Sequence, residues 1–177
     1  QCQEKFSLHW QTDVAKQPGL TSLGMTKAAA DGSFRGLILF GEDPVVTDPD
    51  QNHVKAALTQ LDLLVVAELT MTETAKLADI VLPAASFAEK EGTFTNCERR
   101  VQHISQVLPP KGSAKGDWQW LQALAQRMGS KQLNWANSEQ VFNEMAALTP
   151  AYHAMTYAKI IQQQGLQWPC TKDSPDG

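Results

Sequence analysis

Short apolar runs alternate with polar, Gly- and Pro-containing segments along this chain, and the alternation predicts strands joined by helices. Three apolar runs are expected to form buried strands, namely 35–40, 63–66 and 80–82. Between the first and the second, apolar residues at helical spacing predict a helix from Asp50, as its N-cap, to about Gln60. A shorter helix is expected at 72–77. Strands and helices that alternate with short links are typical of parallel βαβ units with right-handed crossovers.

The segments on either side of this pattern are expected to be helical or irregular. Thr21 is a candidate N-cap for a helix over 22–30, whereas prolines and aspartates predict turns over 41–50. Residues 102–116 are expected to be extended and irregular. Further helices are expected at 117–128, 138–147 and 150–163, before a tail over 165–177 that ends in a disorder-like sequence. The apolar stripe expected to face inward from the helix at 117–128 consists of Trp118, Leu121, Leu124 and Ala125.

Length and composition are those of an ordinary globular protein. The chain has 177 residues, of which 42% are hydrophobic and 19% charged, so one α/β domain is the default and two small ones are possible. The net charge is −4 and no basic cluster exceeds a dipeptide, which disfavours nucleic acid as a partner. The sequence has no apolar run near the ~20 residues of a membrane-spanning helix and no signal-peptide pattern. We therefore expect a cytoplasmic location without membrane insertion.

The cysteines and histidines have no metal-ligand spacing. Cys2, Cys97 and Cys170 are far apart, no CxxC occurs, and reduced thiols are the expectation. The four histidines show no HxxxH or His–Cys grouping, so no metal site is expected. GxGxxG, GxxxxGK[ST] and GxSxG are also absent from the sequence. The nicotinamide fingerprint, the P-loop and the nucleophile elbow are therefore missing.

An acidic loop directly follows the first predicted strand. Gly41 permits a close backbone approach, and Glu42, Asp43 and Asp48 offer only acceptors. Loops at the carboxyl ends of parallel strands carry the ligand in open α/β sheets. The acids would suit the N–H and O–H donors of a guanine edge or a ribose and would not suit phosphate. A solvated acidic turn without a ligand is the alternative.

A second candidate site is Glu68, which ends the apolar run of the second strand. An acid at this position can hold a ribose hydroxyl, although a purely structural role is the alternative. The threonines that follow it, at positions 70, 72 and 74, are interpreted as caps and turn hydroxyls.

The third candidate site is the run AEKEGTFTNCERR, over 88–100, which is interpreted as a ligand-facing loop. Lys90 could meet a pyrophosphate as a point charge. Arg99 and Arg100 could bind an anion, or could instead form ion pairs with Glu89, Glu91 and Glu98.

Several of these segments together resemble the molybdopterin oxidoreductases, and within that family the large (alpha) subunits of formate dehydrogenases. The motifs are GEDPVVTDPDQNHV, LDLLVV, TETAKLADIVLPAASFAEKEGTFTNCERRVQ, DWQWLQALAQRMG and GLQWPC. The resemblance extends over nearly the whole chain and is strongest over 36–129. It implies an internal fragment, because family members are several times longer and carry an iron–sulfur motif and a molybdenum-ligating Cys or selenocysteine that this sequence lacks.

The resemblance also implies a fold and a division of the chain. The expected fold is α/β, a partial dinucleotide-binding-like (Rossmann-like) parallel sheet with flanking helices and a helical C-terminal part. Residues 1–34 would form a mixed segment that leads into the sheet. Residues 35–130 would form the part that binds molybdopterin guanine dinucleotide, and 131–177 a helical segment with a flexible tail.

Cofactor contacts are implied where this sequence matches the family motifs. They are Gly41, Glu42, Asp43, Thr47, Lys90 and Asp117. Glu68 stands where the family usually has Asp after Gln or Ser, so its side chain is one methylene longer. Cys97 stands where Thr or Ala is common, and we expect it to pack. No catalytic residue and no metal ligand is expected in this chain.

The function implied is cofactor binding within a formate dehydrogenase that oxidises formate to carbon dioxide. The cofactor would be bis-molybdopterin guanine dinucleotide with Mo or W, and a 4Fe–4S cluster would lie outside this fragment. The partners would be the remainder of the same subunit and electron-transfer subunits. One alternative is the large subunit of an NADH–quinone oxidoreductase or a nitrate reductase. A second is a stand-alone, non-catalytic nucleotide-binding or interaction module.

Overall fold

The chain forms two compact units in a computed structural model, which describes residues 2–177 except the side chain of Cys2. The first unit combines the chain up to Lys16 with 87–109 and 121–177. The second combines 17–86 with 110–120. These units cut the chain at other residues than the three segments expected from the sequence, and that division stays a prediction.

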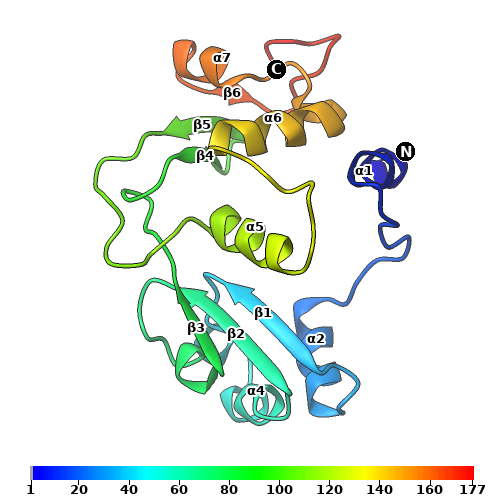
Figure 1. Cartoon of the computed structure of the whole chain (residues 1–177), viewed down its shortest axis with the longest axis vertical. Helices are drawn as coiled ribbons and strands as arrows, with labels where there is room; N and C mark the ends of the chain where they lie inside the picture. Colours follow the sequence, from blue (N-terminus) through cyan, green and yellow to red (C-terminus); the bar gives the residue numbers. More distant parts are fainter. Residues whose placement is uncertain (1) are drawn as a thin grey trace. The chain divides into compact units, whose positions relative to one another are not determined.

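The second unit is built on a three-stranded parallel sheet in the order β1-β2-β3 (Figure 1). Its strands are β1 (Gly36–Phe40), β2 (Leu63–Glu68) and β3 (Ile80–Pro83). In the register, Leu39 lies opposite Val66, and Val66 opposite Val81. The expected strands and their parallel arrangement are thereby confirmed.

Two helices of this unit begin at the predicted N-caps, whereas the helix expected at 72–77 is shortened to a 3₁₀ turn over 75–77. They are α2 (Ser22–Ala30), α3 (Pro44–Thr47), α4 (Gln51–Leu58) and the 3₁₀ turn η1 (Ala75–Leu77). The Thr21 hydroxyl accepts a hydrogen bond from the Gly24 N–H, and Asp50 accepts one from the His53 N–H. The prediction that 41–50 lacks regular structure is wrong, because α3 lies within it. Pro44 occupies the first turn, where its fixed φ and missing N–H are tolerated.

The core of this unit lies on one face of the sheet. Val45, Val54 and Leu58 from α3 and α4 pack there with Leu64 and Val66 of β2. Side chains on successive strand residues point to opposite faces. Leu63 of β2, Ile38 of β1 and Ile80 of β3 therefore project from the other face. These three side chains are 44%, 44% and 48% exposed. We call the two sides the covered face and the open face.

The first unit holds an antiparallel sheet and four helical segments (Figure 1). The strands are β4 (Gly92–Thr95), β5 (Arg100–Ile104) and β6 (Leu166–Gln167). The helical segments are α1 (Cys2–Trp10), α6 (Ser138–Leu148), η2 (Pro150–Tyr152) and α7 (Tyr157–Gln162). Helix α5 (Asp117–Arg127) begins in the second unit and continues into the first.

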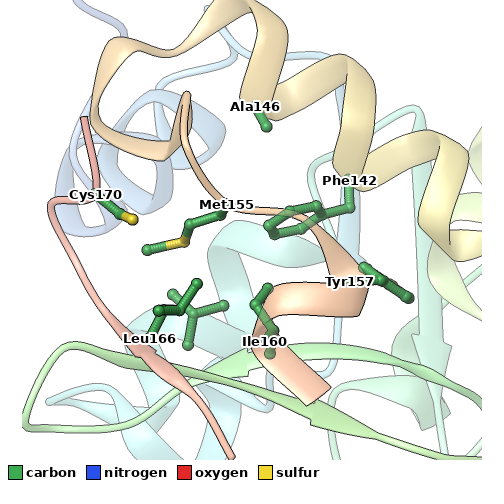
Figure 2. Packing of buried hydrophobic residues seen from close by; sticks show 8 residues of the cluster. Phe142, Ala146, Met155, Tyr157, Ile160, Leu166 and Cys170 are labelled. Carbon is green, nitrogen blue, oxygen red and sulfur yellow. The ribbon is translucent and has the colours of Figure 1, made fainter. Parts of the chain in front are cut away.

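The core of the first unit gathers side chains from α6, α7, β6 and the tail (Figure 2). Met155, Ile160 and Leu166 are each at most 2% exposed. Cys170 lies beside them, and its burial raises the pKa of the thiol. The Trp10 and Trp135 indole N–H groups both donate to the Glu144 carboxylate, which ties α1 to α6.

Four sequence-based expectations for this part of the chain are wrong. Residues 88–100 contain β4 and the start of β5, so the run interpreted as one ligand-facing loop is mostly a hairpin. The single helix expected at 150–163 is split into η2 and α7. The tail contributes β6 and the buried Cys170, because pairing with β5 orders a segment whose composition is polar. The inward stripe expected on α5 includes Leu121 and Leu124, which are 45% and 44% exposed.

Candidate functional site

The loops that follow the three parallel strands meet at one edge of the sheet, because the strands run in the same direction. The Gly41 N–H donates to the Ala67 carbonyl at 2.9 Å and continues the β1–β2 ladder into the first loop. After β3, the Ala85 N–H donates to the Lys115 carbonyl at 2.9 Å. The segment before α5 is thereby attached to the same edge.

Gly41 and Glu42 begin the loop after β1. Gly41 has a φ of +64°, a conformation that favours glycine and turns the chain away from the strand. Glu42 is exposed, and its carboxylate forms no hydrogen bond or ion pair within residues 2–177. Both of its oxygens are therefore open to a ligand that carries N–H or O–H donors.

Asp43 is held in place by the loop that follows β2. Its Oδ1 accepts from the Thr74 hydroxyl at 2.6 Å and from the Thr74 N–H at 3.0 Å. The Thr74 hydroxyl in turn accepts from the Val45 N–H at 3.1 Å. Thr74 is 0% exposed, and Asp43 is partly exposed. One carboxylate oxygen of Asp43 is thus tied to the protein.

Thr47 and Glu68 both bond to nearby backbone. The Thr47 hydroxyl donates to the Asp43 carbonyl at 3.1 Å, so its proton is committed while its oxygen can still accept. Glu68 ends β2, and its Oε2 accepts from the Leu69 N–H at 3.1 Å. Its other oxygen, Oε1, forms no hydrogen bond within the described part of the chain.

Asp117 is the first residue of α5, where a negative charge is favourable at a helix N-terminus. Lys115, two residues earlier, forms a parallel bridge with Ala84 directly after β3. The structure therefore brings Gly41, Glu42, Asp43, Thr47, Glu68 and Asp117 to one edge of the second unit.

Lys90 is the exception among the predicted cofactor contacts, because it lies in the first unit, in the segment before β4. Its approach to a ligand at the sheet edge stays a prediction. The Arg99 guanidinium lies 6.0 Å from the centre of the Trp168 ring, and Arg100 donates to the Gly165 carbonyl. The acids considered as their partners include Glu91, which instead accepts from the Ser138 hydroxyl at 3.0 Å.

Thr72 and Cys97 are two further residues for which the sequence predicted a role. Thr72 accepts from the Ala75 N–H, so the interpretation of this threonine as a cap is confirmed. Cys97 is exposed, so the packing role expected for it is wrong. It lies in the turn between β4 and β5, where there is little core to pack against.

Sequence reasoning missed the role of Thr74. It treated this residue as one of several turn hydroxyls, and the sequence signal could not separate the three threonines. Only the pairing of two loops, 31 positions apart, shows that Thr74 holds Asp43.

The described residues contain neither a group of metal ligands nor a membrane-spanning helix. Within residues 2–177, as far as they are described, no three His, Cys, Asp or Glu side chains group as metal ligands. None of the helices in that part of the chain is long and apolar enough to cross a membrane.

Comparison with curated proteins finds formate dehydrogenase subunits. The chain is 44% identical over 173 residues to the "F420-dependent formate dehydrogenase subunit alpha" of Methanocaldococcus jannaschii, covering 97% of this chain and 25% of that protein. It is 45% identical over 175 residues to the "F420-dependent formate dehydrogenase 2 subunit alpha" of Methanococcus maripaludis, covering 97% and 26%. The chain thus spans about a quarter of the length of these relatives.

A solved structure matches the fold of this chain, and a family model matches its sequence. The structure of acetylene hydratase from Pelobacter acetylenicus matches 93% of this chain and 23% of its own, with a TM-score of 0.66 and 22% sequence identity. At that identity the match shows the fold alone. The family model described as molybdopterin oxidoreductase matches residues 3–127. This chain therefore belongs to the molybdopterin oxidoreductase family.

Proposed function

We propose that this chain is the part of a formate dehydrogenase alpha subunit that binds the nucleotide end of a molybdopterin guanine dinucleotide. The family and the names of the relatives support a molybdopterin cofactor and formate as the substrate of the whole subunit. The single observation that carries the site is the row of acids at the carboxyl edge of the parallel sheet. It includes Glu42, whose carboxylate forms no hydrogen bond or ion pair within the described residues.

The chemistry of this edge fits a nucleoside better than a phosphate. Glu42 and the Oδ2 atom of Asp43 are acceptors, and the donors of a guanine edge and a ribose are N–H and O–H groups. Carboxylates repel the oxygens of a pyrophosphate, which would need a cation such as Lys90. We infer that the guanosine faces the acidic edge of the second unit, and contact of Lys90 with the pyrophosphate stays a prediction from the sequence.

In this proposal, the residues of the chain bind and orient the cofactor and take no part in the reaction. The bound cofactor, as bis-molybdopterin guanine dinucleotide with Mo or W, supplies the two-electron chemistry that converts formate to carbon dioxide. The acids hold the nucleotide at the sheet edge, and Gly41 lets the backbone turn beside it. We expect no formate oxidation by this chain alone.

The proposed partners are the remainder of the same subunit and electron-transfer subunits, which would receive electrons through a 4Fe–4S cluster. The open face of the parallel sheet supports the first of these, because parallel sheets are usually covered on both faces. We propose the cytoplasm as the location of the complex.

The test uses the 177-residue chain and guanosine diphosphate as the probe, followed by NMR. We expect GDP at about millimolar concentration to shift the amide signals of 41–47 and 68, and ADP to shift them less. Glu42→Gln should weaken GDP binding. The control is Asp62→Asn, at the opposite end of β2, where the carboxylate pairs with Arg35 instead. Equal responses to GDP and ADP, or no response at this edge, would contradict the proposal.

A further inference from the structure

We propose that Thr74 is a positioning residue that fixes Asp43 and leaves a single carboxylate oxygen, Oδ2, for the nucleotide. This inference rests on the proposed function for its ligand, and on the two loops of the second unit for its geometry. The contact joins the loop after β1 to the loop after β2.

The hydrogen bonds around Thr74 form a closed set. The hydroxyl donates its one proton to Asp43 Oδ1 and accepts from the Val45 N–H. The Thr74 N–H donates to the same Oδ1. A hydroxyl buried to 0% exposure has no water to replace these partners, so this orientation of the side chain is strongly preferred.

The set determines which atom of Asp43 can meet a ligand. Oδ1 already accepts two hydrogen bonds, which is the usual capacity of one carboxylate oxygen. Oδ2 forms none within the described part of the chain. Asp43 can therefore accept from one ligand group, such as a ribose hydroxyl or one N–H, and cannot grip two adjacent N–H groups with both oxygens.

The division of labour between the two acids follows from this geometry. A guanine edge presents adjacent N1–H and N2–H donors, which suit a carboxylate with both oxygens open. Within the acidic loop, that description fits Glu42, whereas Asp43 suits a single donor. We assign the base edge to Glu42 and a single donor, the ribose hydroxyl, to Asp43 Oδ2.

One group of variants separates the two oxygens of Asp43 in the chain titrated with GDP. Asp43→Asn keeps an Oδ1 acceptor for Thr74 and replaces Oδ2 with an NH₂ donor. We expect it to weaken GDP binding about tenfold, which is the range of a hydrogen bond to a charged group, with little change in stability to urea. Titration with 2′-deoxy-GDP and 3′-deoxy-GDP measures the affinity lost when one ribose hydroxyl is removed. For the hydroxyl that Asp43 binds, this loss should be smaller in Asp43→Asn than in the wild type.

A second group tests the positioning role of Thr74. Thr74→Val removes the hydroxyl while it keeps the shape, and Thr74→Ser restores the hydroxyl. We expect Val to weaken GDP binding several-fold and to speed hydrogen exchange of the Val45 N–H, and Ser to recover both. The control is Thr70→Val, because the Thr70 side chain is exposed and its hydroxyl has no partner within the described residues.

The outcomes separate this inference from the proposed function. If the wild-type chain does not bind GDP at the sheet edge, the proposed function fails and the ligand assignment fails with it. Exchange at Val45 still decides the Thr74 contacts in that case, because it needs no nucleotide. Unchanged exchange in Thr74→Val would overturn the positioning role. Faster exchange at Val45 in Thr74→Val, with unchanged GDP affinity, would overturn the proposed effect of Thr74 on ligand binding.

Discussion

The covered and open faces of the parallel sheet are made from equally apolar residues but differ in burial. On the covered face, Leu64 and Val66 of the central strand are 1% and 0% exposed. On the open face, Leu63 of the same strand is 44% exposed, and Ile38 and Ile80 in the flanking strands are exposed to a similar extent. Part of the open face is protected, because Val65 and Ala67 of the same strand are 8% and 0% exposed.

The difference shows that the apolar pattern of a strand specifies a buried position without providing the cover. Helices α3 and α4 lie between the first two strands in the sequence and cover one face. The described chain leaves part of the other face in solvent, at Leu63, Ile38 and Ile80, although parallel strands are normally buried on both sides. The relatives are about four times longer and so contain segments that have no counterpart in this chain.

The largest effect is expected from the neighbouring leucines on opposite faces of β2. Leu64→Ala should lower the free energy of unfolding by about 2–5 kcal/mol, because it opens a cavity in the core. Leu63→Ala should cost about 1 kcal/mol or less, because its side chain is already half in solvent. Urea denaturation of both variants measures the difference. Equal losses would show that the open face is covered in solution.

A smaller effect is expected from the cap of α4, the helix that covers the sheet. Asp50 accepts from the His53 N–H and has a φ of +59°, which a side chain such as that of alanine adopts with strain. Asp50→Ala should therefore cost about 1–2 kcal/mol in the same assay. Asp50→Asn, which keeps the acceptor and tolerates this φ, is the control and should cost much less. A similar loss in both variants would point to the charge of Asp50 as the cause.

Polar substitutions on the open face should hardly alter stability but should alter association. A chain with both Ile38→Thr and Ile80→Thr should change in stability by about 0.5–1 kcal/mol and self-associate less, because an exposed apolar patch favours contact between copies. Sedimentation velocity at several concentrations measures the association. Val107→Thr, at a position 77% exposed in the first unit, serves as the control. Unchanged association would show that the open face is not the contact.

The smallest effect is expected at Glu73, beside η1 on the covered side. The hydrogen bond from Lys76 lowers the pKa of Glu73 below its ordinary value of 4.5. Because the lowered pKa belongs to the folded state, the pair contributes stability above pH 4.5 and loses it as the pH falls through the folded pKa. Lys76→Met should raise the pKa of Glu73, as measured by NMR titration. Since the pair is exposed, stability should change little.

Local signals made the second unit predictable. The three parallel strands are mostly apolar runs, and the caps Thr21 and Asp50 mark one helix before β1 and one between β1 and β2. The first unit was harder to predict because β5 pairs with β6 across more than 60 residues. A two-residue strand in a polar tail has no periodicity that sequence reasoning can use.

The candidate site was predictable to the level of the loop and not of the atom. Acids after an apolar strand were enough to select Glu42, Asp43 and Glu68, because parallel strands bring their carboxyl ends together. The sequence contained no sign that Thr74 would tie up one oxygen of Asp43. The contact of Lys90 with the same ligand stays a prediction, because that residue belongs to the other unit.

The sequence by itself determined the parallel sheet, its capped helices, the acidic edge and the family, because each depends on residues close together in the chain or on long motifs. The tertiary structure alone decided which face of the sheet is covered, how the tail enters a core, and which oxygen of Asp43 remains open. These properties depend on contacts between segments that are distant in the sequence, and those contacts determine burial and hydrogen bonding.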